Sequence, residues 1–500
     1  MSSGLYTGLR PLPGRILRVV ARNGRRGILV ALTVAIGLAL MMNGAVAAPY
    51  RQIAFLLLCL PLLACLATPL TRPATRRLWR WSVVCGVVLL AWALLQTVAL
   101  PFGLLANPVW DTLTELGIPA GQTISVAPAE TRAALPTLAL PFLVFAAMLL
   151  LCQEKREAVF AWKLLAALGL ALVGLSVVLE IGFPGVRFFS SFEVGRGAFS
   201  GIFVNRNTTA AFLGLVAFAT AGWLLLPRQE TGRRRSRTNS PAGPEWLRIV
   251  LSALLFLVIV ALITTRSRAG VTLALICLTL AAAAVFLLQP GRSSGPASQL
   301  GPRAKAALVL VAGTCVFVAF GEPVVSRMGS EGEDGRWCAW AGTLQVIAER
   351  PLTGFGFATF AEVFPRFRDP ECLGTVGTWR RAHNSHLELL AGMGAVGGVV
   401  MAAALAVLVG TLVTGVRRRR SLRPIPVLGL GALAFMLAHS AVDFPLQIPG
   451  VALYFAALMG AGASVSILSR EAPPNRASPR SRETAFRAGL VNETPENPLN

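Results

Sequence analysis

Apolar residues in this chain gather in long continuous runs, separated by short segments rich in arginine, glycine or proline. Twelve of these runs approach the roughly 20 residues that a helix needs to cross a hydrocarbon layer. The pattern predicts an all-α fold, a polytopic integral membrane helical bundle with about twelve transmembrane helices and one large extracytoplasmic loop. The expected spans lie near residues 27–46, 51–70, 81–101, 136–152, 159–182, 207–227, 246–265, 269–289, 306–322, 387–416, 425–442 and 449–469.

Composition and charge support a membrane protein and set its orientation. Of the 500 residues, 55% are apolar and 14% are charged, whereas soluble domains carry roughly 25% charge. The net charge of +23 does not indicate a nucleic-acid partner, because the basic residues stand in short runs between apolar stretches. With a cytoplasmic N-terminus, the cytoplasmic segments hold 32 of the 46 Lys and Arg residues. The positive-inside rule therefore predicts that both termini are cytoplasmic and that membrane lipids surround the protein.

The spans and loops suggest three regions. Residues 1–158 would form N-terminal transmembrane helices, residues 159–470 a second transmembrane domain, and residues 471–500 a disordered cytoplasmic tail that is polar and rich in proline. The loop at 323–386 is too long to be a simple connector. The N-terminal apolar run resembles a signal peptide up to Ala47, but it is long for one, and we expect a retained first helix.

Two features of the large loop predict local structure. Trp337, Trp340, Leu344 and Ile347 follow helical spacing, which indicates either a helix at the membrane interface or a helix packed against the spans. Cys338 and Cys372 share the loop, and an extracytoplasmic pair of this kind is expected to form a disulfide. The other six cysteines lie in or beside spans, and no Cys/His zinc spacing occurs, so we expect no metal.

Charged residues at the outer ends of the predicted spans are the strongest functional signal, because ionisable groups at membrane depth are costly and mark functional sites by default. Arg206 begins the sixth span, and Arg266 and Arg268 occupy the short turn before the eighth. A helix N-terminus and a guanidinium fork both favour phosphate groups. The alternatives are an arginine that reaches to lipid headgroups and salt bridges within the loops.

Histidines form a second group on the same face. His383 and His386 stand one helical turn apart at the start of the tenth span, directly after Arg380 and Arg381. His439 and Asp443 end the eleventh span, where Asp443 could orient His439 or pair with an arginine. Either loop histidine could act as a general base. The alternatives are that the two loop histidines bind a metal, or that the histidines have a purely structural role in caps and turns.

Together these residues suit an anionic, diphosphate-linked lipid substrate and a hydroxyl acceptor. Arginines can stabilise the charge that grows on a leaving diphosphate, and a histidine can remove the acceptor proton. The chain has no Walker A motif, no kinase signature and no acidic nucleotide-sugar cluster. The energy for transfer would then have to be stored in the substrate, and no cofactor is expected.

Five motifs resemble the O-antigen ligase and polymerase superfamily of bacterial envelope proteins, over roughly residues 160–470. They are GIFVNRNTT (201–209), TRSRAG (265–270), PLTGFGFATF (351–360), AHNSHLELL with GMGAVG (382–397) and HSAVDFPLQIP (439–449). The resemblance implies a multi-pass protein of the bacterial inner membrane, with its active site on the periplasmic face. It implies transfer of a glycan from an undecaprenyl diphosphate carrier to a lipid A-core or glycan acceptor, without metal.

Matched motif by motif, the resemblance assigns Arg206 and Arg266 or Arg268 to the diphosphate and His383 to acceptor activation. His386 stands at a position that varies in the family. An O-antigen ligase is the leading interpretation, and a polymerase is the alternative within the same class. A lipid-linked glycan transporter is a competing class, but transporter sites lie near the membrane midplane between repeats. A non-catalytic assembly protein is a third.

Overall fold

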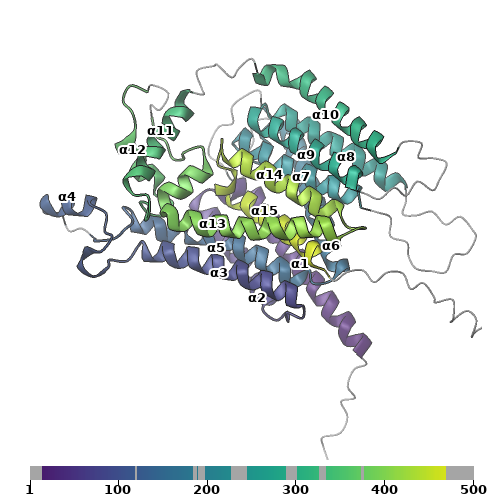
Figure 1. The fold of residues 1–500 in the computed structure, drawn as a ribbon, viewed down its shortest axis with the longest axis horizontal. Helices are drawn as coiled ribbons and strands as arrows, with labels where there is room; N and C mark the ends of the chain where they lie inside the picture. The colour runs from purple at the N-terminus through teal and green to yellow at the C-terminus, as the bar shows by residue number, and fades with distance from the viewer. Residues whose placement is uncertain are drawn as a thin grey trace, which may run out of the picture. The chain divides into compact units, whose positions relative to one another are not determined.

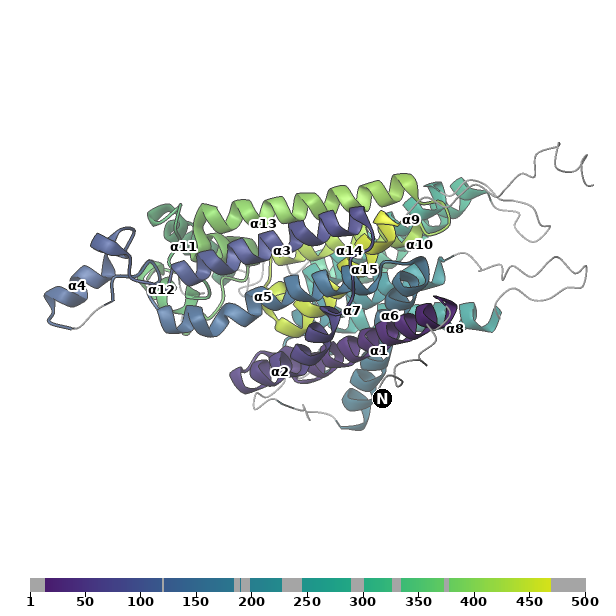
Figure 2. The same ribbon diagram turned by 90° about the horizontal axis from the view of Figure 1, so that it is seen from below.

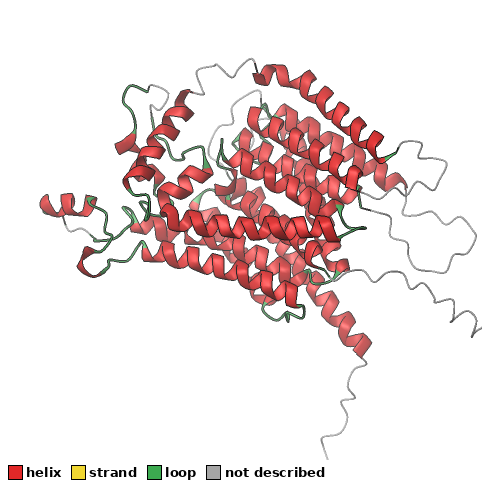
Figure 3. Cartoon of the chain, viewed as in Figure 1, coloured by secondary structure: helices red, strands yellow, loops and turns green. Residues whose placement is uncertain are grey.

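The fold was analysed in a computed structural model that describes residues 14–118, 121–183, 189, 198–226, 245–288, 301–325, 334–372 and 377–468. Within these residues the structure is helical and contains no strand (Figure 3). Residues up to Ile467 form one compact unit. The predicted tail at 471–500 lies outside the described residues. The helices are α1 (Gly14–Met41), α2 (Ala48–Cys65), α3 (Pro73–Leu95), α4 (Val109–Glu115), α5 (Pro128–Leu151), α6 (Lys155–Gly182), α7 (Arg206–Leu224), α8 (Glu245–Thr264), α9 (Arg268–Leu288), α10 (Pro302–Val325), α11 (Asp334–Glu349), α12 (Phe360–Phe367), α13 (Ser385–Arg418), α14 (Pro424–Ser440) and α15 (Pro449–Ile467).

The all-α, multi-pass membrane fold expected from the sequence is confirmed. Every predicted span coincides with a helix, and ten helices in the described part are long and apolar enough to cross a membrane. The two further predicted spans correspond to α14, an apolar helix of 17 residues, and to α10. The loop at 323–386 contains the two helices α11 and α12, so the predicted connector has structure of its own.

Two helices, α7 and α15, form the core of the bundle. Their apolar windows are 83% and 89% buried, against 11% for α13 and 22% for α8. Both core helices are rich in glycine and alanine, which let neighbouring backbones approach closely. A Cβ atom at Gly460 of α15 would lie 2.6 Å from Cβ of Met148 on α5. Small residues therefore determine which helices occupy the centre.

The segments that connect helices at the predicted outer ends gather at one end of the bundle. Both views place α4, α11 and α12 at this end (Figures 1 and 2). Helices α7, α9 and α13 begin there, and α8 and α14 end there, as alternating crossings require. The residues singled out by the sequence therefore share one end of the fold.

A kink in α13 anchors the large loop to the bundle. Gly394 has φ +60°, outside the helical range, and backbone hydrogen bonds connect residues 351–356 to α13 on both sides of it. Gln96 of the connection after α3 is fully buried beside this joint, and its amide donates to the carbonyls of Thr353 and Gly392. Its carbonyl accepts the N–H of Phe357. The glycine-rich motifs at 351–360 and 392–397 thus form a close backbone contact that side chains would obstruct.

Helix α11 has one buried and one exposed face. Ala339, Thr343 and Val346 are buried, whereas Trp337 and Leu344 are exposed. The helix predicted around the tryptophans is therefore present, and it packs against the bundle while presenting apolar side chains outward. Cys338 on α11 and Cys372 after α12 form a disulfide, with Cα atoms 6.3 Å apart.

Candidate active site

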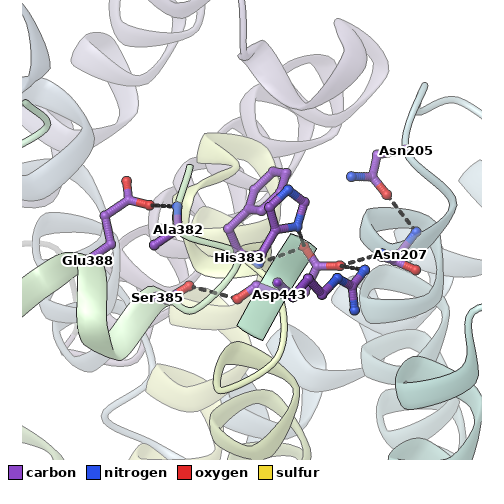
Figure 4. A network of polar contacts seen from close by, with 9 residues as sticks. Asn205, Asn207, Ala382, His383, Ser385, Glu388 and Asp443 are labelled. Carbon is purple, nitrogen blue, oxygen red and sulfur yellow. Dashed lines mark hydrogen bonds and ion pairs between the residues drawn. The ribbon is translucent and has the colours of Figure 1, made fainter. Parts of the chain in front are cut away.

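Asp443 is the centre of a polar network at the outer end of the bundle, in the connection that follows α14 (Figure 4). Its carboxylate accepts a hydrogen bond from the side-chain amide of Asn207, on the first turn of α7. Nδ1 of His383 lies 3.7 Å from Oδ1, and a guanidinium nitrogen of Arg336 lies 3.9 Å from Oδ2. Four segments distant in sequence therefore meet at one carboxylate.

This carboxylate is negatively charged at neutral pH. Burial raises the pKa of Asp443, since only 5% of its side chain is exposed, but favourable contacts outweigh the effect of burial. These contacts come from the imidazoles of His383 and His439 and from the backbone N–H of Phe444, which donates to Oδ1. The net pKa lies below the ordinary value of 3.8. A buried carboxylate that is ionised at neutral pH and lies beside an imidazole can hold that ring in place and stabilise its protonated form.

The loop before α13 holds His383 in an unusual conformation. His383 has φ +51°, in the left-handed region that non-glycine residues seldom occupy. Glu388 stabilises the preceding residues, because its buried carboxylate accepts the N–H of Ala382 and pairs with Arg381 at 3.0 Å. The side chain of Asn384 accepts the N–H groups of His386 and Leu387 and so begins α13. The backbone cost at His383 is of the kind stored at functional sites.

The imidazole of His383 lies between two aromatic rings. The ring centroids of Trp379 and Phe444 lie 5.4 Å and 4.8 Å from it, both edge to face. The side chain remains 28% exposed. One ring nitrogen therefore faces Asp443 while part of the ring stays accessible, as a general base requires.

The three predicted diphosphate ligands lie at the N-terminal ends of two helices. Arg206 is exposed on the first turn of α7, after the N-cap Asn205 and directly before Asn207, which binds Asp443. Arg266 is exposed and has φ +53°, and Arg268 is half-buried at the start of α9. The positive ends of the α7 and α9 dipoles therefore lie beside these arginines.

The turn that carries Arg266 and Arg268 is packed against the end of α14. A Cβ atom at Gly270 would lie 2.8 Å from Oγ of Ser267 and 3.4 Å from Cε1 of His439. His439 is buried and stacks on Phe435, with centroids 5.7 Å apart. It therefore packs below the arginine turn, whereas Asp443, four residues later, reaches His383. From the sequence, Asp443 was expected to orient His439 or to pair with an arginine. In the structure an arginine, Arg336, lies beside its carboxylate, and the imidazole next to Oδ1 is that of His383.

The remaining predicted residues differ in position. Nε2 of His386 lies 2.9 Å from the carbonyl oxygen of Leu437, so this histidine connects α13 to α14. Arg381 is paired with Glu388, and Arg380 is exposed. Among the described residues no group of three histidine, cysteine or acidic side chains has an arrangement that could hold a metal ion.

Sequence reasoning missed three contributors to this site. Arg336 was overlooked because a single arginine next to two tryptophans in a long loop carries no local signal. Glu388 lies within a quoted motif, but its link to the backbone of Ala382 depends on how the loop turns back. Asn207 is similar: its spacing from Asn205 indicates a helix start, and only the packing of α7 against α14 gives it Asp443 as a partner.

Residues 253–402 match the family model described as O-Antigen ligase. This segment is an O-antigen ligase domain. The resemblance to the O-antigen ligase superfamily is confirmed, and with it a role of this multi-pass membrane protein in glycan assembly. Among curated proteins, none matches the sequence.

The O-antigen ligase domain contributes only part of the polar network. It runs from within α8 to the middle of α13 and contains Arg266, Arg268, Arg336 and His383. Arg206, Asn207 and Asp443 lie outside it, on α7 and after α14. The site is completed by helices on either side of the matched segment.

Proposed function

We propose that this O-antigen ligase superfamily member is a glycosyltransferase of the bacterial inner membrane. It would transfer a glycan from an undecaprenyl diphosphate carrier to an acceptor hydroxyl during the assembly of cell-envelope polysaccharide or lipopolysaccharide. Both termini would be cytoplasmic, with the site at the periplasmic face. The observation that carries the proposal is the convergence of His383, Asn207 and Arg336 on the buried carboxylate of Asp443.

The proposed reaction assigns one role to each group. His383 removes the proton of the acceptor hydroxyl, and the oxygen attacks the anomeric carbon of the glycan. The bond from that carbon to the diphosphate oxygen breaks, and the carrier diphosphate leaves with the negative charge. Arg206, Arg266 and Arg268 stabilise this charge, so that no metal is required. Asp443 orients His383 and stabilises its cation.

Transfer to a lipid A-core, the ligase reaction, is the first candidate because of the matched domain. Polymerisation on the carrier is the second candidate. A transporter, the competing class, needs no catalytic base. That hypothesis therefore does not explain why an accessible imidazole, His383, lies beside the buried carboxylate of Asp443.

The test is transfer by the purified protein in vesicles that contain a carrier-linked glycan and either lipid A-core or carrier-linked glycan as the acceptor. We expect a longer product and release of the carrier diphosphate, both insensitive to EDTA. Arg266→Ala should reduce transfer by about 100-fold. Arg366→Ala is the matched control, because Arg366 is 62% exposed and pairs with Glu349 on the loop surface. Movement of the intact glycan lipid without cleavage would contradict the proposal.

A further inference from the structure

Two residues of the large loop reach the buried carboxylate of Asp443 from separate segments of that loop. Arg336 lies on the first turn of α11, with a guanidinium nitrogen 3.9 Å from Oδ2. His383 precedes α13, with Nδ1 3.7 Å from Oδ1. The side-chain amide of Asn207 also binds Oδ2, so that Asn207 and Arg336 lie on one oxygen while the other faces the base. The position of Arg336 therefore affects how the carboxylate presents Oδ1 to His383.

The position of Arg336 depends on its helix rather than on hydrogen bonds. Within the described part of the chain its guanidinium donates no hydrogen bond, and the contact with Asp443 at 3.9 Å is longer than one. The side chain is 30% exposed, and an arginine side chain has much rotamer freedom to lose when it is ordered. A small displacement of the backbone at the start of α11 would therefore carry the guanidinium away from Oδ2.

The two halves of α11 are attached to the protein in different ways. The second half is anchored in the bundle, because Val346 packs in one buried cluster with Phe355 of the joint and Ala391 of α13. The start of the helix is partly open to solvent, since Trp337, directly after Arg336, is 64% exposed. Apolar packing therefore fixes the second half of α11 more firmly than the turn that carries Arg336.

The disulfide of the large loop lies at this less firmly packed end. Cys338 stands two residues after Arg336, and its bond to Cys372 ties the start of α11 to the segment that follows α12. That segment is itself held by hydrogen bonds, because the side chain of Arg368 donates to the carbonyl of Gly377 and the N–H of Cys372 donates to the carbonyl of Asp369. The covalent bond therefore fixes the turn that packing leaves less constrained.

From this arrangement we infer that the Cys338–Cys372 disulfide is a positioning element for glycan transfer, which keeps Arg336 against Oδ2 of Asp443. The inference rests on the proposed function. When the two cysteines are thiols, the protein keeps its helices, but the start of α11 moves and Asp443 orients His383 less well. The folded enzyme is therefore fully active only in its oxidised form. A disulfide that acted on the unfolded chain alone would raise stability and leave the rate of the folded enzyme unchanged.

The experiment compares the oxidised and reduced full-length protein in vesicles, at a temperature at which both forms are folded. Dithiothreitol breaks the bond between the two Sγ atoms by exchange: the cysteine sulfurs become thiols, and the reagent closes into its own ring disulfide. The kcat for transfer should fall by about tenfold, and the KM for the donor should change much less. The double variant Cys338→Ser/Cys372→Ser should have the same low kcat without reductant. It is also the matched control, because dithiothreitol should not change its rate.

Two further measurements separate positioning from general stabilisation. Arg336→Gln should have a kcat close to that of the reduced protein, and reduction should lower it by less than about twofold more, because the disulfide and Arg336 act through one contact. Hydrogen exchange followed by mass spectrometry needs no turnover. On reduction, the amides at the start of α11 should exchange faster, whereas those around Val346 should remain protected.

Three results would overturn the inference: a kcat of the folded, reduced protein within about twofold of the oxidised protein, an equal loss of kcat on reduction of the Arg336→Gln protein, or unchanged exchange at the start of α11. The exchange measurement decides even where a variant has too little transfer to follow. Absence of transfer by the oxidised, unaltered protein would reject the proposed function. Normal transfer that does not respond to reduction would reject only the positioning role of the disulfide.

Discussion

Replacement of Asp443 by asparagine tests the central network with little change in side-chain volume. The substitution removes the negative charge 3.7 Å from Nδ1 of His383. At an effective dielectric constant of about 20, two unit charges at this distance attract by about 4.5 kcal/mol. His383 is partly exposed, so that solvent screening reduces the loss to about 3 kcal/mol. Because this attraction arises only when the base is protonated, kcat should fall by about 100-fold.

The assay is the rate of glycan transfer in vesicles, measured over a range of donor concentrations. The KM for the donor should change much less than kcat, since Asp443 acts through His383 rather than on the diphosphate. Asp369→Asn is the control, because Asp369 is an exposed acidic residue two positions after the end of α12. Equal thermal stability and expression would show that the protein remains folded. A kcat of Asp443→Asn within threefold of the unaltered protein would refute the role of Asp443.

Other variants test neighbouring parts of the site. His383→Ala should abolish transfer while the protein accumulates normally in the membrane, which immunoblotting of the membrane fraction and a transfer assay would show. Arg266→Lys should remain at least tenfold impaired in the same assay, because an ammonium group lacks the guanidinium fork. Cys338→Ser should lower stability by about 2–4 kcal/mol, since the bridge closes a loop of 34 residues; dithiothreitol should lower the Tm of the unaltered protein and not that of the variant. Because the pKa of Asp443 is lower in the folded protein than its ordinary 3.8, its contribution to stability is present above about pH 3.8 and is lost as the pH falls through the folded value. Asp443→Asn should remove this component from a plot of Tm against pH.

The sequence predicted the membrane-spanning helices well because continuous apolar runs carry that information locally. It also indicated the end of the bundle at which the candidate site lies, since the placement of Arg206, Arg266 and His383 follows from counting crossings. Neither inference requires knowledge of which helices are neighbours.

The contacts between helices could not be predicted in the same way. Asn207 and Asp443 are 236 residues apart, and their pairing depends on α7 packing against α14. Gln96 looks like an ordinary polar residue at the end of a span, yet its amide connects two distant parts of the chain.

The joint between the large loop and the kink of α13 restricts how the enzyme can move. Lifting the loop would break the hydrogen bonds that Phe355 and Gly356 donate to α13 and the bonds of Gln96, each with a net value of about 1 kcal/mol. A loop that lifted away from the bundle at every turnover would break them repeatedly. Long glycans are therefore expected to reach and leave this site by lateral diffusion of their lipid anchors within the plane of the bilayer.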